Sequence, residues 1–238
     1  MNTSTNKDDD IENINGALAD GLTLVRVLLT PLIMFIIIRA WSGQEDDPMG
    51  FVSLDLALVL LASFLFAIAA LTDLLDDKIG GSLKKNGRLL GWFDDMADSV
   101  LVGGTLLALL WVTYKAGLLH WSFAVPAFTI IGRDIFLALV KGSEFSKYGF
   151  LETRLGDIKS ALAMLATCIL VASPWLSNFI DGLRAGDTAE SALKVYDNAS
   201  PIVWNIGLVI LWIAAILAVI TAFKFMTAKM QTPDETKA

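Results

Sequence analysis

The chain of 238 residues is too apolar for an ordinary soluble domain. Hydrophobic residues make up 55% of it and its mean hydropathy is +0.62, values typical of a polytopic membrane protein. The formal net charge of −7 argues against nucleic acid as a partner. The single cysteine, Cys168, lies in an apolar run and excludes a disulfide framework.

The N-terminal segment, residues 1–15, is polar and acidic, and we expect a disordered tail there because it holds little that could be buried. It has the features of neither a signal peptide nor an arginine-rich transit peptide. Residues 16–228 are expected to form one membrane domain, and residues 229–238 a short polar tail.

Six apolar segments follow one another along the chain, and each is long enough to cross a bilayer as a helix. The expected helices are residues 16–38, 51–79, 89–114, 121–140, 160–180 and 201–226. Pro31 lies inside the first of them and is expected to kink it. The sequence therefore predicts an all-α protein with six transmembrane helices.

The distribution of basic residues predicts how these helices are oriented. Lys84, Lys85 and Arg88 lie between the second and third helices, and Lys141 and Lys147 lie between the fourth and fifth. The connections on the other side are poor in lysine and arginine. By the positive-inside rule, both termini and the basic connections are expected on the cytoplasmic side.

Four aspartates lie at the ends of the second and third helices. Asp73 and Asp76 are i and i+3 neighbours, and Asp94 and Asp98 are i and i+4 neighbours, so each pair shares a helix face. Carboxylates at such depth face a wet cavity, a partner or an ion. Because four negative charges repel strongly at low dielectric, we expect two divalent cations between them. Oxygen ligands favour Mg²⁺ or Mn²⁺.

The spacing of these aspartates is specific. Asp73-x2-Asp76, with Asp94-x3-Asp98 beginning eighteen residues after Asp76, resembles the signature D-x2-D-G-x2-A-R-x8-G-x3-D-x3-D of the CDP-alcohol phosphatidyltransferases. Six helices with cytoplasmic termini are also that family's architecture. The resemblance implies transfer of a phosphatidyl group from CDP-diacylglycerol to an alcohol, with release of CMP.

Three further segments resemble the bacterial phosphatidylglycerophosphate synthases of this family. Residues 22–26, Leu-Thr-Leu-Val-Arg, resemble part of their first helix. Residues 131–135, Ile-Gly-Arg-Asp-Ile, resemble their Arg-Glu-Ile segment, and residues 156–160, Gly-Asp-Ile-Lys-Ser, resemble the Gly-Lys-x-Lys-Thr start of their fifth helix. The resemblance therefore covers nearly the whole chain.

The resemblance also assigns roles to the acidic residues. It implies that Asp73, Asp76 and Asp94 are metal ligands, and that Asp98 completes the second of two Mg²⁺ or Mn²⁺ sites. Asp98 would also serve as the general base that activates the acceptor hydroxyl.

An acceptor that carries its own phosphate needs cations. Arg133, Arg154 and Lys159 are the candidates, since guanidinium and ammonium groups bind phosphate. Their presence favours glycerol 3-phosphate over an uncharged alcohol. We expect a structural or headgroup-binding role for Arg26.

The donor-binding positions depart from the signature. Thr23, Asp77, Gly80 and Gly81 stand at these positions, where the signature has glycine at Asp77 and Ala-Arg at Gly80-Gly81. A second hypothesis is therefore an altered or inactive family member that acts as a membrane partner or regulatory protein. A third is a divalent cation transporter, but that function predicts carboxylates at the bilayer midplane rather than beside a basic connection.

The resemblance also implies a cellular location and binding partners. It predicts an integral protein of the bacterial inner membrane whose active site faces the cytoplasm. Its expected partners are CDP-diacylglycerol, a phosphorylated small alcohol, membrane lipid and a second copy of the chain.

Overall fold

The computed structural model describes residues 4–41, 54–80, 91–144, 154–185 and 201–230. These residues form helices and short turns and contain no strand. The helices are α1 (Ser4–Trp41), α2 (Leu56–Gly80), α3 (Gly91–Lys115), α4 (Trp121–Glu144), α5 (Arg154–Ala185) and α6 (Ile202–Met230). Each contains a span long and apolar enough to cross a membrane. The predicted all-α fold with six such helices is confirmed.

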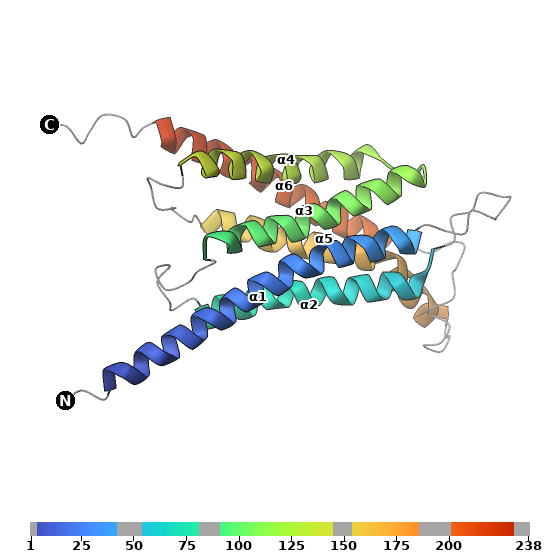
Figure 1. The fold of residues 1–238 in the computed structure, drawn as a ribbon. Helices are drawn as coiled ribbons and strands as arrows, with labels where there is room; N and C mark the ends of the chain where they lie inside the picture. Colours follow the sequence, from blue (N-terminus) through green and yellow to red (C-terminus); the bar gives the residue numbers. More distant parts are fainter. Residues whose placement is uncertain (1–3, 42–53, 81–90, 145–153, 186–200, 231–238) are drawn as a thin grey trace.

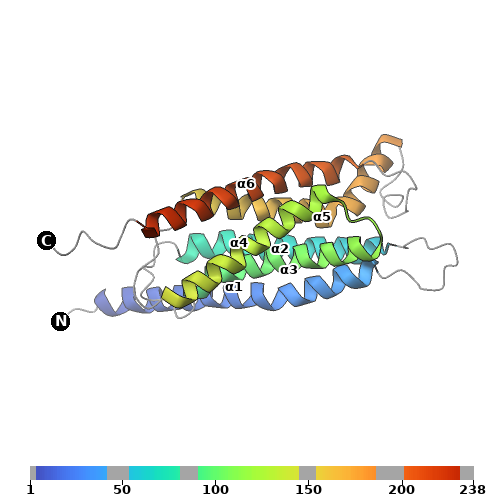
Figure 2. The ribbon, with the colours of Figure 1, turned by 90° about the horizontal axis from the view of Figure 1, so that it is seen from above.

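The helices form an elongated bundle (Figure 1). In it, α1 packs along α2 and α3, while α5 packs along α6 and also contacts α2. Seen from above, α4 begins beside α6, which it contacts, and runs diagonally across the bundle (Figure 2). The start of α1 and the end of α6 lie at one end of the bundle, together with the ends of α2 and α4 and the starts of α3 and α5. This end carries the predicted functional residues.

The helices bury many small residues between them and expose many large apolar ones, as expected when lipid covers the outside. Ala62, Ala69 and Ala166 are fully buried between helices, whereas Phe35 and Phe64 are among the exposed large apolar residues. Small residues let membrane helices approach closely, and lipid tails solvate the apolar exterior. The protein is an integral membrane protein by this pattern.

One close approach joins α1 to α3. A Cβ atom at Gly104 would lie 2.8 Å from Thr30 Cγ2 and 3.0 Å from Met34 Sδ. The Thr30 hydroxyl donates a hydrogen bond of 3.0 Å to the carbonyl of Arg26, one turn earlier in α1. Only glycine allows this contact, and the contact holds the turn of α1 that carries Arg26 against α3.

Some helix ends differ from the sequence-based prediction. The helix predicted to begin at residue 160 begins at Arg154, so Lys159 lies inside α5 rather than in a polar connection. The structure also continues α1 back to Ser4, through most of the predicted tail. Helix ends are hard to predict from the sequence, because polar residues readily extend helices past the membrane surface. The division into a tail and one membrane domain stays a prediction.

Candidate active site

Arg26 joins three helices at the functional end of the bundle. Its side chain is 0% exposed. Its Nη1 donates a hydrogen bond to the carboxylate of Asp98 in α3 and lies 3.2 Å from Asp73 Oδ1 in α2. A charge buried among apolar helices is tolerated only when it is paired in this way. The two carboxylates predicted to act together are therefore brought together, around a guanidinium.

Both carboxylates lie near one end of their helices. Asp73 is seven residues before the last residue of α2 (Gly80), and Asp98 is seven residues after the first residue of α3 (Gly91). Their side chains are 22% and 17% exposed. Both carboxylates are thus only partly buried, at the end of the bundle where α2 ends and α3 begins.

Several predicted site residues have no described side chain. Asp76 lies one turn after Asp73 in α2, and Asp94 lies one turn before Asp98 in α3. The backbone is described, but not the side chain, at Asp76, Asp77, Asp94 and Arg154, while Gly80 ends α2 and Gly81 falls outside the described residues. Thr23 is described: it is fully buried, one turn before Arg26 in α1.

Asp73 and Asp98 are the members of the predicted metal site whose side chains the structure describes. Within the described side chains, no group of three or more histidine, cysteine, aspartate or glutamate residues could hold a metal ion. Because Asp76 and Asp94 are not among those side chains, the metal site stays a prediction. Carboxylate oxygens from two helices already converge on one positive charge, that of Arg26. Such hard oxygen ligands fit Mg²⁺ or Mn²⁺.

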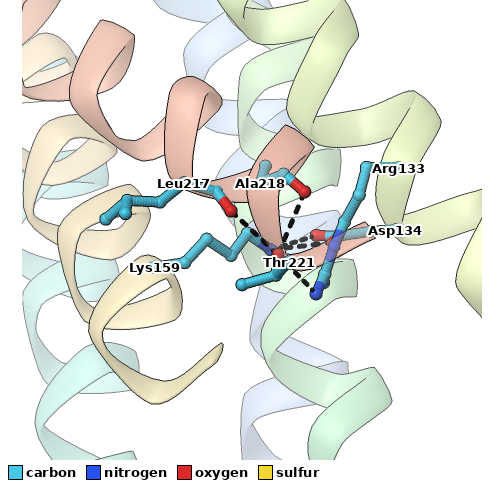
Figure 3. A network of polar contacts seen from close by, with 6 residues as sticks. All are labelled: Arg133, Asp134, Lys159, Leu217, Ala218 and Thr221. Carbon is cyan, nitrogen blue, oxygen red and sulfur yellow. Dashed lines mark hydrogen bonds and ion pairs between the residues drawn. The ribbon is translucent and has the colours of Figure 1, made fainter. Parts of the chain in front are cut away.

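A second polar cluster joins α4, α5 and α6 (Figure 3). Lys159 Nζ donates to both carboxylate oxygens of Asp134, at 2.7 and 3.0 Å. Arg133 Nη1 donates to Asp134 at 2.8 Å, and its Nη2 donates to the Thr221 hydroxyl at 3.2 Å. That hydroxyl also donates to carbonyls of its own helix. Two of the three predicted acceptor-binding residues, Arg133 and Lys159, thus lie together.

Among the described residues, this cluster has more positive than negative charge. Two cations face one carboxylate, and Lys159 is only 4% exposed. Arg133 Nε is buried without a hydrogen-bond partner among the described residues. An anion such as a phosphate would balance the charge and could accept a hydrogen bond from Arg133 Nε. Asp98 near the start of α3 and Lys159 near the start of α5 lie toward the same end of the bundle.

Sequence reasoning assigned no site role to Asp134 or Thr221, and it expected a structural or headgroup-binding role for Arg26. A lone arginine in an apolar span needs a buried partner, so Arg26 could have been matched to the aspartates. Asp134 directly follows a predicted phosphate-binding arginine and could have been read as its counter-ion. Thr221 gives no such signal, since a threonine in an apolar helix can satisfy its hydroxyl on its own backbone, as Thr221 also does.

Comparison with known proteins places the sequence in a family. A family model described as CDP-alcohol phosphatidyltransferase matches residues 16–220. The chain is 26% identical over 230 residues to a CDP-diacylglycerol–glycerol-3-phosphate 3-phosphatidyltransferase of Cereibacter sphaeroides, covering 89% of the chain and 95% of that protein. It is 28% identical over 158 residues to a Salmonella typhimurium protein of the same name, covering 64% of the chain and 75% of that protein.

Two relatives from Arabidopsis thaliana carry the same enzyme name. One is 30% identical over 161 residues, which cover 64% of the chain, and the other is 28% identical over 195 residues, which cover 78% of it. The matched parts are 63% and 59% of these two relatives, so the chain spans about three fifths of their length.

Proposed function

The chain belongs to the CDP-alcohol phosphatidyltransferase family, and we propose that it transfers the phosphatidyl group of CDP-diacylglycerol to glycerol 3-phosphate. The reaction releases CMP. The relatives named above support this choice of donor and acceptor. The observation that carries the proposal is the pairing of a cationic cluster, Arg133 and Lys159, with the carboxylate pair Asp73 and Asp98 at one end of the bundle.

The cationic cluster supplies the acceptor site. Arg133 and Lys159 bind the phosphate of glycerol 3-phosphate, with Arg133 Nε as a further donor. Arg154, the first residue of α5, is a third candidate cation. A neutral alcohol would leave the excess positive charge of this cluster unbalanced, which is why a phosphorylated acceptor is favoured.

The four aspartates of α2 and α3 supply the chemistry. Asp98 takes the proton from the acceptor hydroxyl as its oxygen attacks the phosphorus that bears diacylglycerol. The bond from that phosphorus to the CMP oxygen breaks, and CMP leaves. When bound by Asp73, Asp76, Asp94 and Asp98, two Mg²⁺ or Mn²⁺ ions supply Lewis acidity at the donor's diphosphate. Thr23, Asp77, Gly80 and Gly81 lie at the donor-binding positions.

We also propose a location and an oligomeric state. The protein lies in the bacterial inner membrane as a homodimer, with its termini and active site facing the cytoplasm. The donor's acyl chains stay in the bilayer. The departures from the signature at Asp77 and Gly81 favour, as the second candidate, a family member with altered or lost activity that acts through a membrane partner. A cation transporter fits less well, because Asp73 and Asp98 pair with Arg26 at one end of the bundle.

Release of CMP tests the proposal. Purified protein in lipid nanodiscs receives CDP-diacylglycerol, glycerol 3-phosphate and Mg²⁺ or Mn²⁺. The expected result is CMP release that falls by about a hundredfold or more in Asp98→Asn, since general bases contribute on that order. Asp55→Asn is the matched control, because Asp55 is exposed before the first turn of α2, at the opposite end of the bundle, and asparagine can still cap that helix. No CMP with any alcohol would favour the altered family member.

A further inference from the structure

Arg26 occupies the position between two carboxylates that the proposed function assigns to metal binding. Its Nη1 contacts Asp73 Oδ1 and Asp98 Oδ1, which come from different helices. Arg26 is fully buried and both carboxylates are largely buried. In such surroundings, two carboxylates without a cation between them would repel strongly. A guanidinium and a divalent ion on the same oxygens would also repel each other.

We propose that Arg26 is a positioning residue that holds Asp73 and Asp98 together as an internal counter-cation and competes with the divalent ion for these carboxylates. The inference rests on the proposed metal-dependent function and deepens it. Loading the site requires the guanidinium to give up its charge-assisted bonds to Asp73 and Asp98. This competition lowers the affinity of the site for the free ion. It also keeps the helices together when no metal is bound.

The backbone around Arg26 supports competition by side-chain movement rather than by movement of α1. The Arg26 carbonyl accepts a hydrogen bond from the Thr30 hydroxyl. Thr30 itself packs against Gly104 of α3, where even a methyl group would not fit without a shift. The turn that carries Arg26 is therefore fixed to α3. Exchange between the guanidinium and an ion therefore requires movement of the long, rotatable Arg26 side chain.

Binding of Mn²⁺ alone, without substrates, tests the inference in the full-length protein in nanodiscs. Isothermal titration calorimetry and thermal unfolding with and without Mn²⁺ are compared for wild type, Arg26→Gln and Arg26→Lys. Arg26→Gln should unfold at a lower temperature without metal and bind Mn²⁺ about tenfold more tightly, since a tenfold change in affinity is close to the loss of one such bond. Arg26→Lys keeps the charge and should bind Mn²⁺ as wild type does.

Arg39→Gln is the matched control, because Arg39 is exposed on the same helix, and it should change neither measurement. Equal or weaker Mn²⁺ binding by Arg26→Gln would overturn the inference alone, since Arg26 would then be structural or would orient the ligands. Absence of Mn²⁺ binding in wild type would overturn the metal-dependent function and the inference with it.

A second measurement covers the case in which Arg26→Gln does not fold. In wild-type protein labelled with ¹⁵N-arginine, the Arg26 side-chain resonance is identified by its loss in Arg26→Lys. Saturating Mg²⁺ should shift that resonance, because the guanidinium loses its carboxylate partners. An unmoved resonance at saturation would overturn the inference.

Discussion

Lys159 holds both carboxylate oxygens of Asp134, at 2.7 and 3.0 Å, and so ties α5 to α4 inside the bundle. Arg133 shares the same carboxylate at 2.8 Å. One carboxylate thus orients two cations without neutralising both. The arrangement keeps the cations in place while leaving net positive charge for an anion.

Lys159→Met should weaken binding of the acceptor. Methionine keeps the apolar stem and removes the charge that the acceptor's phosphate is proposed to meet. We expect the KM for glycerol 3-phosphate to rise about tenfold or more, given 1.5–3 kcal/mol for a bond to a charged group. Steady-state CMP release, with each substrate varied in turn, measures this. The KM for CDP-diacylglycerol should hardly change, and an equal rise in both would contradict an acceptor-specific role.

Lys115→Met provides a control for that prediction. Lys115 ends α3 at the opposite end of the bundle, where its ammonium group lies 5.2 Å from the centre of the Trp111 ring. The same substitution there removes an exposed charge and a weak cation–π contact. Both KM values should stay at the wild-type level.

Asp134→Asn should destabilise the protein in a way that an added anion partly reverses. The amide leaves Lys159 and Arg133 without their carboxylate, and breaking a largely buried pair costs about 3 kcal/mol or more. Inorganic phosphate can then balance the two cations. Thermal unfolding with and without phosphate should show a lower Tm for the variant and a larger phosphate-induced rise than in wild type.

The double variant Asp134→Asn with Lys159→Met separates pairing from packing. Because both single changes break the same contact, their effects on the free energy of unfolding should sum to more than the effect of the double variant. Additive effects would mean that the ion pair contributes little to stability.

Gly104→Ala should destabilise the contact between α1 and α3. The added methyl group would meet Thr30 Cγ2 at 2.8 Å and Met34 Sδ at 3.0 Å, and overpacking of this kind costs about 1–3 kcal/mol. Gly103→Ala is the matched control, since its Cβ would meet only Ile131 Cγ1, at 3.9 Å. Thermal unfolding should separate the two variants, and equal Tm values would show that α1 can shift freely.

The six helices were predictable because a bilayer imposes a simple rule: each crossing needs a long apolar run. The approximate positions of Asp73 and Asp98 followed from the same runs and the motif spacing. Arg26 was harder to assign, because sequence separation hides which helices are neighbours. Its contacts with Asp73 and Asp98 depend on α1 lying against both α2 and α3.

The role of Asp134 could not be read from the sequence for a related reason. A charged pair at adjacent positions, such as Arg133 and Asp134, is often solvated at a helix end. Here the carboxylate is turned to Lys159, which lies inside α5 because that helix begins at Arg154. Because the helix predicted from the sequence lacked these first turns of α5, the network of Arg133, Asp134 and Lys159 could not be predicted.

Gly81→Arg tests the departure from the signature at the donor site. An arginine is the residue that the signature has at this position, and its charge would offset the phosphates of CDP-diacylglycerol. We expect CMP release to be unchanged or higher, with an equal or lower KM for CDP-diacylglycerol. Gly87→Arg, at one of the signature's variable positions in the same connection, controls for added positive charge and should leave the KM for the donor unchanged. A large loss of activity in Gly81→Arg alone would mean that the donor site is rebuilt around the glycine, and that donor-binding roles cannot be transferred to Asp77, Gly80 and Gly81.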